Sequence, residues 1–532
     1  MRDTEHPWWE QGVVYQVYPR SFQDSDGDGV GDLAGVESRL DYIAALGVDA
    51  IWLSPIFPSP MADFGYDVAD YCDIEPVFGD LAAFDRLIAA VHARGLKLIL
   101  DFVPNHSSDQ HAWFKASRAS RDDPKRDWYI WRDAAEDGGP PNNWISDFGG
   151  SAWTWDDATG QYYLHAFLKE QPDLNWRNPA LRAAMMDVLR FWMDRGVDGF
   201  RIDVLWHIVK AEGLPDNPLN PDWTPARTER DRVLQRYSTD QPEAHAIASE
   251  MRRLADARGD RVLIGEIFLP NDRHARWYGT ESQPEVHLPF NFQLIENDWN
   301  AGTLARVIAD YEASLPAFGW PNWVFGSHDA PRIAARIGDA QARVAAMVLL
   351  TLRGTPTLYQ GDELGIGQVD IPPDRMRDPQ HFRQPLLGIG RDRSRTPMPW
   401  DATPHAGFTS GDPWLPLNAD WKTRNVAAQA RDPGSLLVFY RELLALRRAT
   451  PALSVGDYVA AASDRDVLAF ERMHDGDRLL VALNFSAEPR AVHLPAGTTI
   501  GKILLSTLDG TAPSPTLRGN EGCIIRLRDA GS

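Results

Sequence analysis

Apolar residues along the chain fall into short runs and into longer stretches with helical spacing. The short runs predict buried strands, and the longer stretches predict amphipathic helices. In the first hundred residues the order is strand, helix, strand, helix, strand, and the two helices end at Gly47 and Gly95. This order is typical of a parallel sheet whose strands are joined by helices.

Eight strands can be counted in this way, and a helix or a long connection follows most of them. The strands are expected at 13–18, 49–56, 97–103, 199–204, 261–268, 289–294, 321–326 and 355–359. The helices are expected at 33–46, 81–94, 181–195, 244–258, 303–315, 341–352 and 435–448. The pattern predicts an α/β fold, a (β/α)8 TIM barrel.

Two regions depart from the alternation. Residues 104–173 are rich in Asp, Trp, Gly and Pro and lack helical spacing, which indicates an insertion domain after the third strand rather than a loop. From Pro451 onward, short alternating runs predict a C-terminal antiparallel β domain. The predicted domains are the barrel at 1–103 and 174–450, the insertion at 104–173, and a β-sandwich-like domain at 451–532.

Charged residues stand where several of these apolar strands end. In a barrel the C-terminal ends of all strands lie at one rim, and active sites form there. Arg201 and Asp203 share one face of the fourth strand, and taken alone they could be a structural ion pair. The other strands end in Asp101 with His106, in Glu266, and in His328 with Asp329. Carboxylates gathered at one rim favour an active site over separate ion pairs.

Carboxylates held close together take different protonation states. Like charges raise at least one pKa, so one carboxyl group stays protonated near neutral pH while another is ionised. Such a pair performs glycoside hydrolysis, in which one carboxylate attacks and another delivers a proton. We predict that Arg201 keeps Asp203 ionised for attack and that Glu266, which has apolar sequence neighbours, is the acid. Asp329 would bind sugar hydroxyls.

Composition limits the partners and the location of the protein. The 532 residues include 54 basic and 75 acidic side chains, a net charge of −21. Nucleic acids and anionic membranes are bound by basic patches, so neither is expected as a partner. Met1–Glu10 lacks the apolar run of a secretory signal, no run approaches transmembrane length, and two cysteines do not suggest a disulfide framework. We therefore expect a cytoplasmic protein.

The charged segments resemble the signature regions of glycoside hydrolase family 13, the α-amylase family. A fifth segment, Gln-Pro-Asp-Leu-Asn-Trp at 171–176, is similar to that of the bacterial α-glucosidase and oligo-1,6-glucosidase branch. The resemblance covers essentially the whole chain, and Ser327 stands where many relatives have Asn. The signature segments are 101–106, 199–203, 265–266, 327–329 and 171–176.

This resemblance implies an exo-acting, retaining α-glucosidase. Asp203 would be the nucleophile, Glu266 the general acid/base, and Asp329 the residue that stabilises the transition state at subsite −1. Tyr66 would be a stacking platform. The remaining substrate-binding residues implied are His106, Arg201 and His328 around that subsite, and Asp63 with Arg391 as a clamp that closes the pocket behind one glucose.

The same resemblance leaves the substrate open among short α-glucosides such as maltose, isomaltose and sucrose. Val204 is similar to the residue of α-1,6-tolerant relatives, whereas Thr or Ala goes with α-1,4 preference. Glucose transfer to sugar or alcohol acceptors is also expected. The protein is expected to be a monomer or a homodimer. One alternative is a glucosyl-transferring isomerase of the sucrose or trehalose type. Another is a non-catalytic binding subunit, which the presence of all three carboxylates disfavours.

An acidic segment near the N-terminus, residues 24–32, carries carboxylates at every second position, separated by glycines. Hard cations prefer several oxygen ligands on such a flexible loop, and a solvated acidic turn is the alternative. The segment is similar to the calcium site of oligo-1,6-glucosidases. This implies a structural Ca²⁺ and no organic cofactor, with the ion held by the side chains of Asp24, Asp26, Asp28 and Asp32 and by the carbonyl of Val30.

Overall fold

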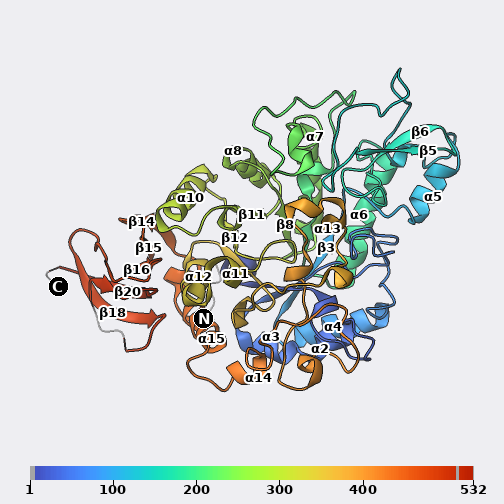
Figure 1. Cartoon of the computed structure of the whole chain (residues 1–532). Coiled ribbons are helices and arrows are strands. Elements are labelled where there is room, and N and C mark those ends of the chain that lie inside the picture. The colour runs from blue at the N-terminus through green and yellow to red at the C-terminus, as the bar shows by residue number, and fades with distance from the viewer. Residues whose placement is uncertain (1–5, 511–513, 531–532) are drawn as a thin grey trace.

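Eight parallel strands close into a barrel in the computed structural model, which describes residues 6–510 and 514–530 (Figure 1). Each strand lies where the sequence predicts it, and most are shorter. In order around the barrel they are β1 (Val14–Val17), β2 (Ala50–Leu53), β3 (Lys97–Phe102), β7 (Gly199–Ile202), β8 (Val262–Glu266), β11 (Leu288–Asn291), β12 (Asn322–Val324) and β13 (Thr355–Tyr359). The predicted fold class is confirmed.

The fourth barrel strand ends earlier than predicted, at Ile202 instead of Val204. Val204 has a positive φ of 36° and lies in the left-handed region, which a β-branched residue rarely adopts. Its backbone N–H donates to the Glu266 carboxylate at 2.9 Å. The turn therefore places Asp203 at the rim and fixes Glu266 beside it, so the local strain lies at the predicted site.

The main helices surround the barrel, and five of the eight begin at a side-chain cap. Asp32, Asp80 and Asn178 each accept a hydrogen bond from a backbone N–H of the first turn of the helix that follows. The predicted helix 33–46 is two helices, because Arg39 has a non-helical ψ of 9°. The main helices are α2 (Leu33–Ser38), α3 (Leu40–Leu46), α4 (Leu81–Ala93), α6 (Pro179–Asp194), α7 (Pro242–Asp256), α10 (Ala301–Ser314), α12 (Ala342–Thr351) and α15 (Leu436–Ala449).

Residues between β3 and α6 form a small antiparallel sheet that stands above the barrel rim (Figure 1). It consists of β4 (Trp131–Arg132), β6 (Gln161–Leu164) and β5 (Trp153–Asp156), and α5 (Ala112–Ala119) precedes it. The long polar connection between β7 and α7 is hydrogen-bonded to this segment. Asn143 and Asn217 exchange two hydrogen bonds of 2.8 Å, and the Trp144 indole N–H donates to Pro215 O at 2.9 Å. The two regions therefore form one wall over the rim.

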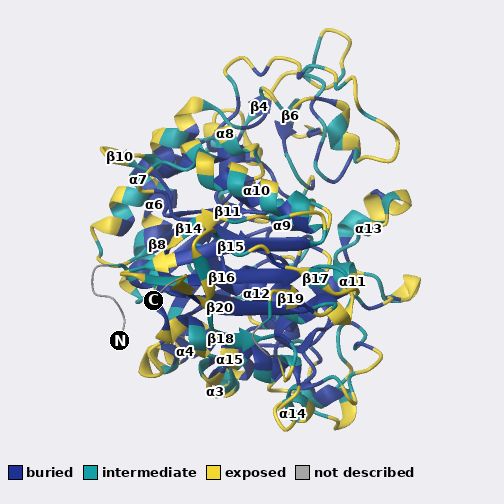
Figure 2. Cartoon of the chain, turned by 90° about the vertical axis from the view of Figure 1, so that its left-hand side faces the viewer, coloured by how far each residue is buried: buried dark blue, intermediate teal, exposed yellow. Residues whose placement is uncertain are grey.

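The C-terminal part is an antiparallel sheet, as predicted. Its strand order is β14 (Asp457–Ala460), β15 (Val467–His474), β16 (Asp477–Asn484), β20 (Gly522–Asp529) and β18 (Thr498–Ser506). A two-stranded sheet, β17 (Arg490–Ala491) with β19 (Thr516–Leu517), lies beside it, and β15, β16 and β20 are mainly buried (Figure 2). The sequence did not predict β14, whose largely exposed residues give no apolar alternation. The predicted outer limits at 1 and 532 lie outside the described residues.

Helix α12 explains how the C-terminal sheet is attached to the barrel. Of its ten residues only Arg343 is not buried, and the helix contacts both α15 and the strands β16 and β20. A helix that is apolar all round is buried on every side.

Among the described residues, the helices are all too short or too polar to span a lipid bilayer.

Candidate active site

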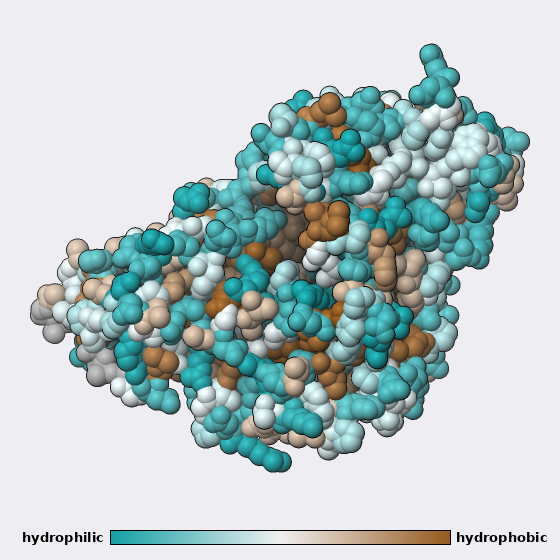
Figure 3. Space-filling model, viewed as in Figure 1, coloured by the Kyte–Doolittle hydropathy of each residue, from teal (hydrophilic) through white to brown (hydrophobic). Residues whose placement is uncertain are grey.

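A cavity of about 460 Å³ opens at the C-terminal ends of the barrel strands. The surface in Figure 3 has a hollow near its centre, with hydrophobic side chains at its edge. The cavity is lined by residues from the barrel rim, the inserted segment, the connection between β7 and α7, and the loop after β13. The lining consists of Asp63, Tyr66, His106, Asp147, Phe148, Phe167, Asp203, Val204, Trp206, Thr228, Arg230, Asp231, Glu266, Phe268, Asp329, Gln380, Ile389 and Arg391.

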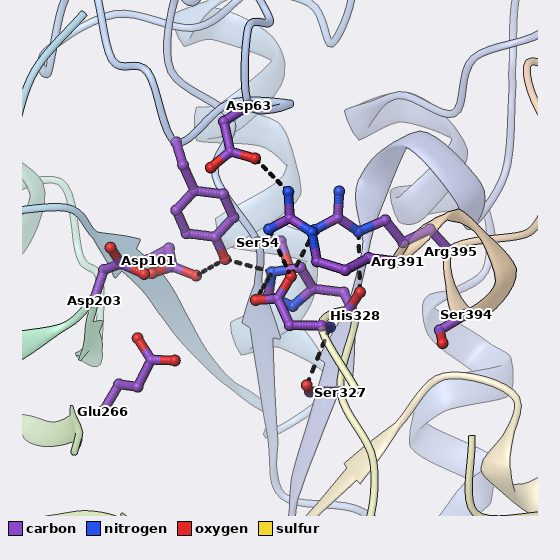
Figure 4. Close-up of polar contacts among 12 residues, drawn as sticks. Ser54, Asp63, Asp101, Asp203, Glu266, Ser327, His328, Arg391, Ser394 and Arg395 are labelled. Atoms are coloured by element: carbon purple, nitrogen blue, oxygen red, sulfur yellow. Dashed lines mark hydrogen bonds and ion pairs between the residues drawn. The ribbon is translucent and has the colours of Figure 1, made fainter. Parts of the chain in front are cut away.

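Three carboxylates share the Arg201 guanidinium at the bottom of this cavity. Arg201 Nη1 lies 2.6 Å from Asp203 Oδ1 and 2.8 Å from Asp101 Oδ1, and Nη2 lies 2.8 Å from Glu266 Oε2. All four side chains are almost fully buried, and Asp203 and Glu266 face the same space in Figure 4. The sequence predicts the pairing of Arg201 with Asp203; the structure shows that the cation is divided among three acids.

Burial sets the protonation of this group. Burial, together with Asp329 and Asp101, raises the pKa of Glu266, as expected of a proton donor. Burial, with Glu266 and Asp101 nearby, also raises the pKa of Asp203, against the lowering effect of Arg201. The predicted effect of Arg201 on Asp203 is present, and burial and the two neighbouring acids act against it. Burial raises the pKa of all three acids, and their close spacing makes each one's titration depend on the others.

His328 is held in one orientation between two tyrosine rings. The rings of Tyr18 and Tyr66 stack on it, with centroid separations of 5.6 and 5.4 Å. Gln16 Nε2 lies 2.7 Å from Nδ1 of His328, and the Tyr66 hydroxyl lies 2.8 Å from Nε2. Because Tyr66 donates to Asp101, its hydroxyl accepts from Nε2–H of His328. Burial lowers the pKa of His328, which favours the neutral ring.

The predicted pair of Asp63 and Arg391 is present, and both side chains line the cavity. Arg391 Nη2 lies 2.7 Å from Asp63 Oδ1, and Nη1 lies 3.2 Å from Asp329 Oδ1. Asp329 is also paired with Arg395 at 2.6 Å. Burial raises the pKa of Asp329, but His328, Arg391 and Arg395 outweigh it and hold this pKa well below its usual range. Asp329 is therefore an ionised carboxylate that faces the cavity.

A third carboxylate paired with Arg391, Asp378, orients the clamp and was not predicted. It accepts from the Arg391 backbone N–H at 2.6 Å, from Nε at 3.1 Å and from Nη2 at 2.7 Å. Asp378 is fully buried, which raises a carboxyl pKa, yet Arg391 and Arg395 lower its pKa to about 2. Asp378 lies in a loop-rich region without a local pattern, so only the folded structure identifies it.

We expect Asp378→Asn to raise the KM for a short α-glucoside about tenfold and to change kcat less, because the amide cannot pair with Arg391 as an anion. Steady-state kinetics on maltose measure both constants. Asp374→Asn, in the one-turn 3-10 helix at Pro373–Arg375, is the matched control. An unchanged KM in the Asp378 variant would contradict this role.

His106 joins the inserted segment to the clamp. Its Nε2 lies 3.1 Å from Gln171 Nε2, and Gln171 also donates to Asp63 at 3.3 Å. Burial lowers the pKa of His106 to about 4, so this ring is neutral. Behind it, Lys210 Nζ pairs with Asp173 at 2.6 Å, with both side chains buried. Lys210 was not predicted, and it fixes the Gln171–Trp176 segment to the loop after β7.

The acidic segment near the N-terminus brings three of its four carboxylates together. Oxygen atoms of Asp24, Asp26 and Asp28 lie within 4.8 Å of one another. These are the hard oxygen ligands that Ca²⁺ prefers; Asp24 is buried, whereas Asp26 and Asp28 are exposed. Asp32 instead accepts from Ser25 and from the Gly35 N–H at 2.7 Å. The first three residues fit a cation; ligation by Asp32 and Val30 stays a prediction.

The barrel and its rim of carboxylates define an enzyme that acts on glycosides. A family model described as "Alpha amylase, catalytic domain" matches residues 16–456, and one described as "Domain of unknown function (DUF3459)" matches residues 456–521. The chain therefore belongs to the α-amylase family, glycoside hydrolase family 13, as its motifs predict.

Relatives in this family match along nearly the whole chain. A "Probable alpha-glucosidase" of Rhizobium meliloti is 41% identical and covers 93% of this chain and 92% of its own length. An "Oligo-1,6-glucosidase" of Halalkalibacterium halodurans is 40% identical, with 94% and 95% covered.

Solved structures with the same fold include an α-glucosyl transfer enzyme, XgtA. It is 41% identical, has a TM-score of 0.93, and covers 98% of this chain and 100% of its own. Another is the trehalulose synthase MutB from Pseudomonas mesoacidophila MX-45, at 39% identity, a TM-score of 0.91 and the same coverage. The first relatives and structures thus comprise hydrolysing and glucosyl-transferring enzymes.

Proposed function

We propose that the protein is an exo-acting, retaining α-glucosidase that removes glucose from the non-reducing end of short α-glucosides. The observation that carries the proposal is the Asp63–Arg391 ion pair of 2.7 Å, whose two side chains line the cavity. We infer that this pair closes the cavity behind one sugar ring. A cavity closed behind one sugar ring admits chain ends and excludes the middle of a polysaccharide. The names of the relatives support the same activity.

The proposed reaction has two steps, each carried by residues at the bottom of the cavity. Asp203 attacks the anomeric carbon while Glu266 gives its proton to the leaving oxygen, so the glycosidic bond breaks and a glucosyl ester of Asp203 forms. Glu266, now ionised, takes a proton from water or from an acceptor hydroxyl, which attacks the same carbon and frees Asp203. Two inversions retain the α configuration, and Asp329, His328 and His106 hold the ring hydroxyls.

Initial rates on maltose, isomaltose, sucrose, trehalose and a long maltodextrin test the proposal. We expect glucose from at least one disaccharide, a much lower rate on the maltodextrin, and release of the α-anomer first, observed by NMR. Early β-glucose would refute retention. Equal rates on disaccharide and polymer would refute exo action.

A glucosyl-transferring isomerase is the second candidate, favoured by the similarity to MutB and by the aromatic acceptor side of the cavity. Trp206 and Phe268 line that side, with ring centroids 5.5 Å apart. Aromatic side chains at this position can hold a released sugar long enough for it to be re-added. An isomerised disaccharide as the main product from sucrose would establish this alternative over hydrolysis.

Linkage preference is expected to depend on Val204. Its side chain lines the cavity directly after Asp203. We expect Val204→Thr to lower the ratio of the isomaltose rate to the maltose rate severalfold, since one side chain contributes about 1–3 kcal/mol of discrimination. Ratios of kcat/KM measure the effect, and Val204→Ile, which stays β-branched and apolar, is the control. An unchanged ratio would remove Val204 as a determinant.

We further propose that Asp24, Asp26 and Asp28 hold a structural Ca²⁺. The loop lies against Thr409, whose hydroxyl donates to Asp24, so a bound ion would tie the N-terminal loop to the segment before α14 (Val426–Gln429). Removal of calcium with a chelator should lower the melting temperature, because saturation at 100 times Kd stabilises a folded chain by about 2.7 kcal/mol. The initial rate should change less.

The matched control for this calcium proposal is Asp26→Asn with Asp28→Asn in one chain. Its melting temperature should not respond to added Ca²⁺ or to the chelator. If neither added Ca²⁺ nor the chelator changes the melting temperature of the native chain, the calcium site is refuted.

A further inference from the structure

Gln16 lies near the carboxyl end of β1 and is completely buried, although its side chain is polar. The two N–H bonds of its Nε2 have acceptors close by: the Ser54 hydroxyl at 3.1 Å and Nδ1 of His328 at 2.7 Å. Its Oε1 has no hydrogen-bond partner among the described residues. Ser54 and His328 lie side by side in Figure 4. The reaction proposed above gives Gln16 no role.

The orientation of this amide is assigned from the surroundings of the other ring nitrogen of His328. Nε2 lies 3.0 Å from Asp329 Oδ2 and 2.8 Å from the Tyr66 hydroxyl oxygen, and both oxygens are acceptors. The ring proton is therefore on Nε2, and a neutral ring then has a bare Nδ1 that requires a donor. The opposite amide orientation would leave two buried N–H bonds unpaired instead of one oxygen, which is less favourable. Gln16 is therefore the donor to His328.

Opposing effects act on the charge of His328. Burial lowers its pKa, whereas the ionised Asp329, 3.0 Å from Nε2, favours the imidazolium. The Gln16 amide opposes the imidazolium, because a second ring proton would point at the N–H of the amide across 2.7 Å. The other charged groups that act on this ring are Arg201, Arg395 and Asp101.

The charge of this ring matters because the proposed reaction passes through a transition state with positive charge on the sugar. An imidazolium beside Asp329 would add positive charge there and weaken the stabilisation that Asp329 provides. We propose that Gln16 is a positioning residue, which holds His328 as the neutral tautomer with its proton on Nε2 and so preserves the negative charge of Asp329 for the transition state. This inference rests on the proposed function and deepens it at the sugar-binding end of the site.

Gln16→Glu tests the proposal, because it replaces the donor with an acceptor of the same size. His328 would then lie between two carboxylates, which favours an imidazolium near neutral pH. NMR of chains that contain [15N]histidine reports the protonation of each ring nitrogen, and the His328→Gln chain identifies the His328 signals. We expect one protonated nitrogen in the native chain and two in Gln16→Glu. On maltose, kcat should fall about tenfold or more, and KM should change less.

Gln360→Glu is the matched control. Gln360 directly follows β13 and is also completely buried, and its Oε1 accepts from the Tyr18 N–H at 2.8 Å, a hydrogen bond that a carboxylate keeps. This chain should show the native His328 signals. If Gln16→Glu does not fold, Gln16→Met decides, because its side chain cannot donate to Nδ1. The pKa of His328, followed by the same NMR signals, should then lie above that of the native chain.

The NMR signals require no turnover, so they separate this inference from the proposed function. A native chain that cleaves no α-glucoside but shows these signals would refute the proposed function and support the role of Gln16 in setting the tautomer. A native ring with a proton on Nδ1 near neutral pH would overturn the inference. So would a neutral ring in Gln16→Glu, or a pKa of His328 in Gln16→Met at or below the native one. An imidazolium in Gln16→Glu with an unchanged kcat would refute the effect on the transition state.

Discussion

Asp203→Asn should abolish turnover, by roughly 10⁴-fold or more, while the chain stays folded. An amide is a poor nucleophile, and no other carboxylate can replace Asp203: Asp101 is held by Arg201, Tyr66 and the Trp52 indole, and Glu266 is required as the acid. Initial rates on the best disaccharide, with a melting curve of the same preparation, measure both parts of the expectation.

The chain should tolerate this substitution because Arg201 keeps two partners. Asp101 and Glu266 remain at 2.8 Å, so no buried cation is left alone. Asp362→Asn is a matched control: it is also a buried carboxyl, and burial raises its pKa to about 7, but it does not line the cavity. The control should keep activity within a few-fold. Near-normal turnover of Asp203→Asn would remove Asp203 as the nucleophile.

The barrel was predictable because its signals are local. Apolar runs and helical spacing identify all eight strands, and the rule that the strand ends meet at one rim brings Asp203, Glu266 and Asp329 together before any coordinates. The end of β7 was misplaced by two residues because apolar alternation continues to Val204, whereas the strand ends at Ile202 and the Val204 N–H donates to Glu266.

The supporting contacts were not predictable, since they join segments that are far apart in the sequence. Gln16 and His328 are 312 positions apart, and Asp378 lies in a region with no periodic pattern. Lys210 and Asp173 pair only because the inserted segment folds back over the rim. The sequence gives the identity of each side chain, but tertiary packing decides which other side chain it contacts.

Glu266→Gln should slow substrates to different extents, depending on whether their leaving group needs a proton. With maltose, whose leaving hydroxyl needs a proton, we expect a loss of about 10²–10⁴-fold, the usual contribution of general acid catalysis. With α-glucosyl fluoride the leaving group needs no proton, so formation of the glucosyl ester should be nearly normal. The second step then lacks its base, and the ester on Asp203 should accumulate, observable by mass spectrometry as the addition of one glucosyl group.

The pH profile gives an independent check of the same residue. Burial raises the pKa of Glu266, and only its protonated form can donate, so activity of the native chain on maltose should fall as pH rises through that pKa. Gln cannot lose a proton, so this alkaline decline should be absent from the variant. Glu285→Gln is the matched control: burial raises the pKa of Glu285 too, but it pairs with His245 at 2.7 Å outside the cavity, so its profile should stay native. A Glu266→Gln variant that keeps the decline would assign the proton to another member of the trio around Arg201.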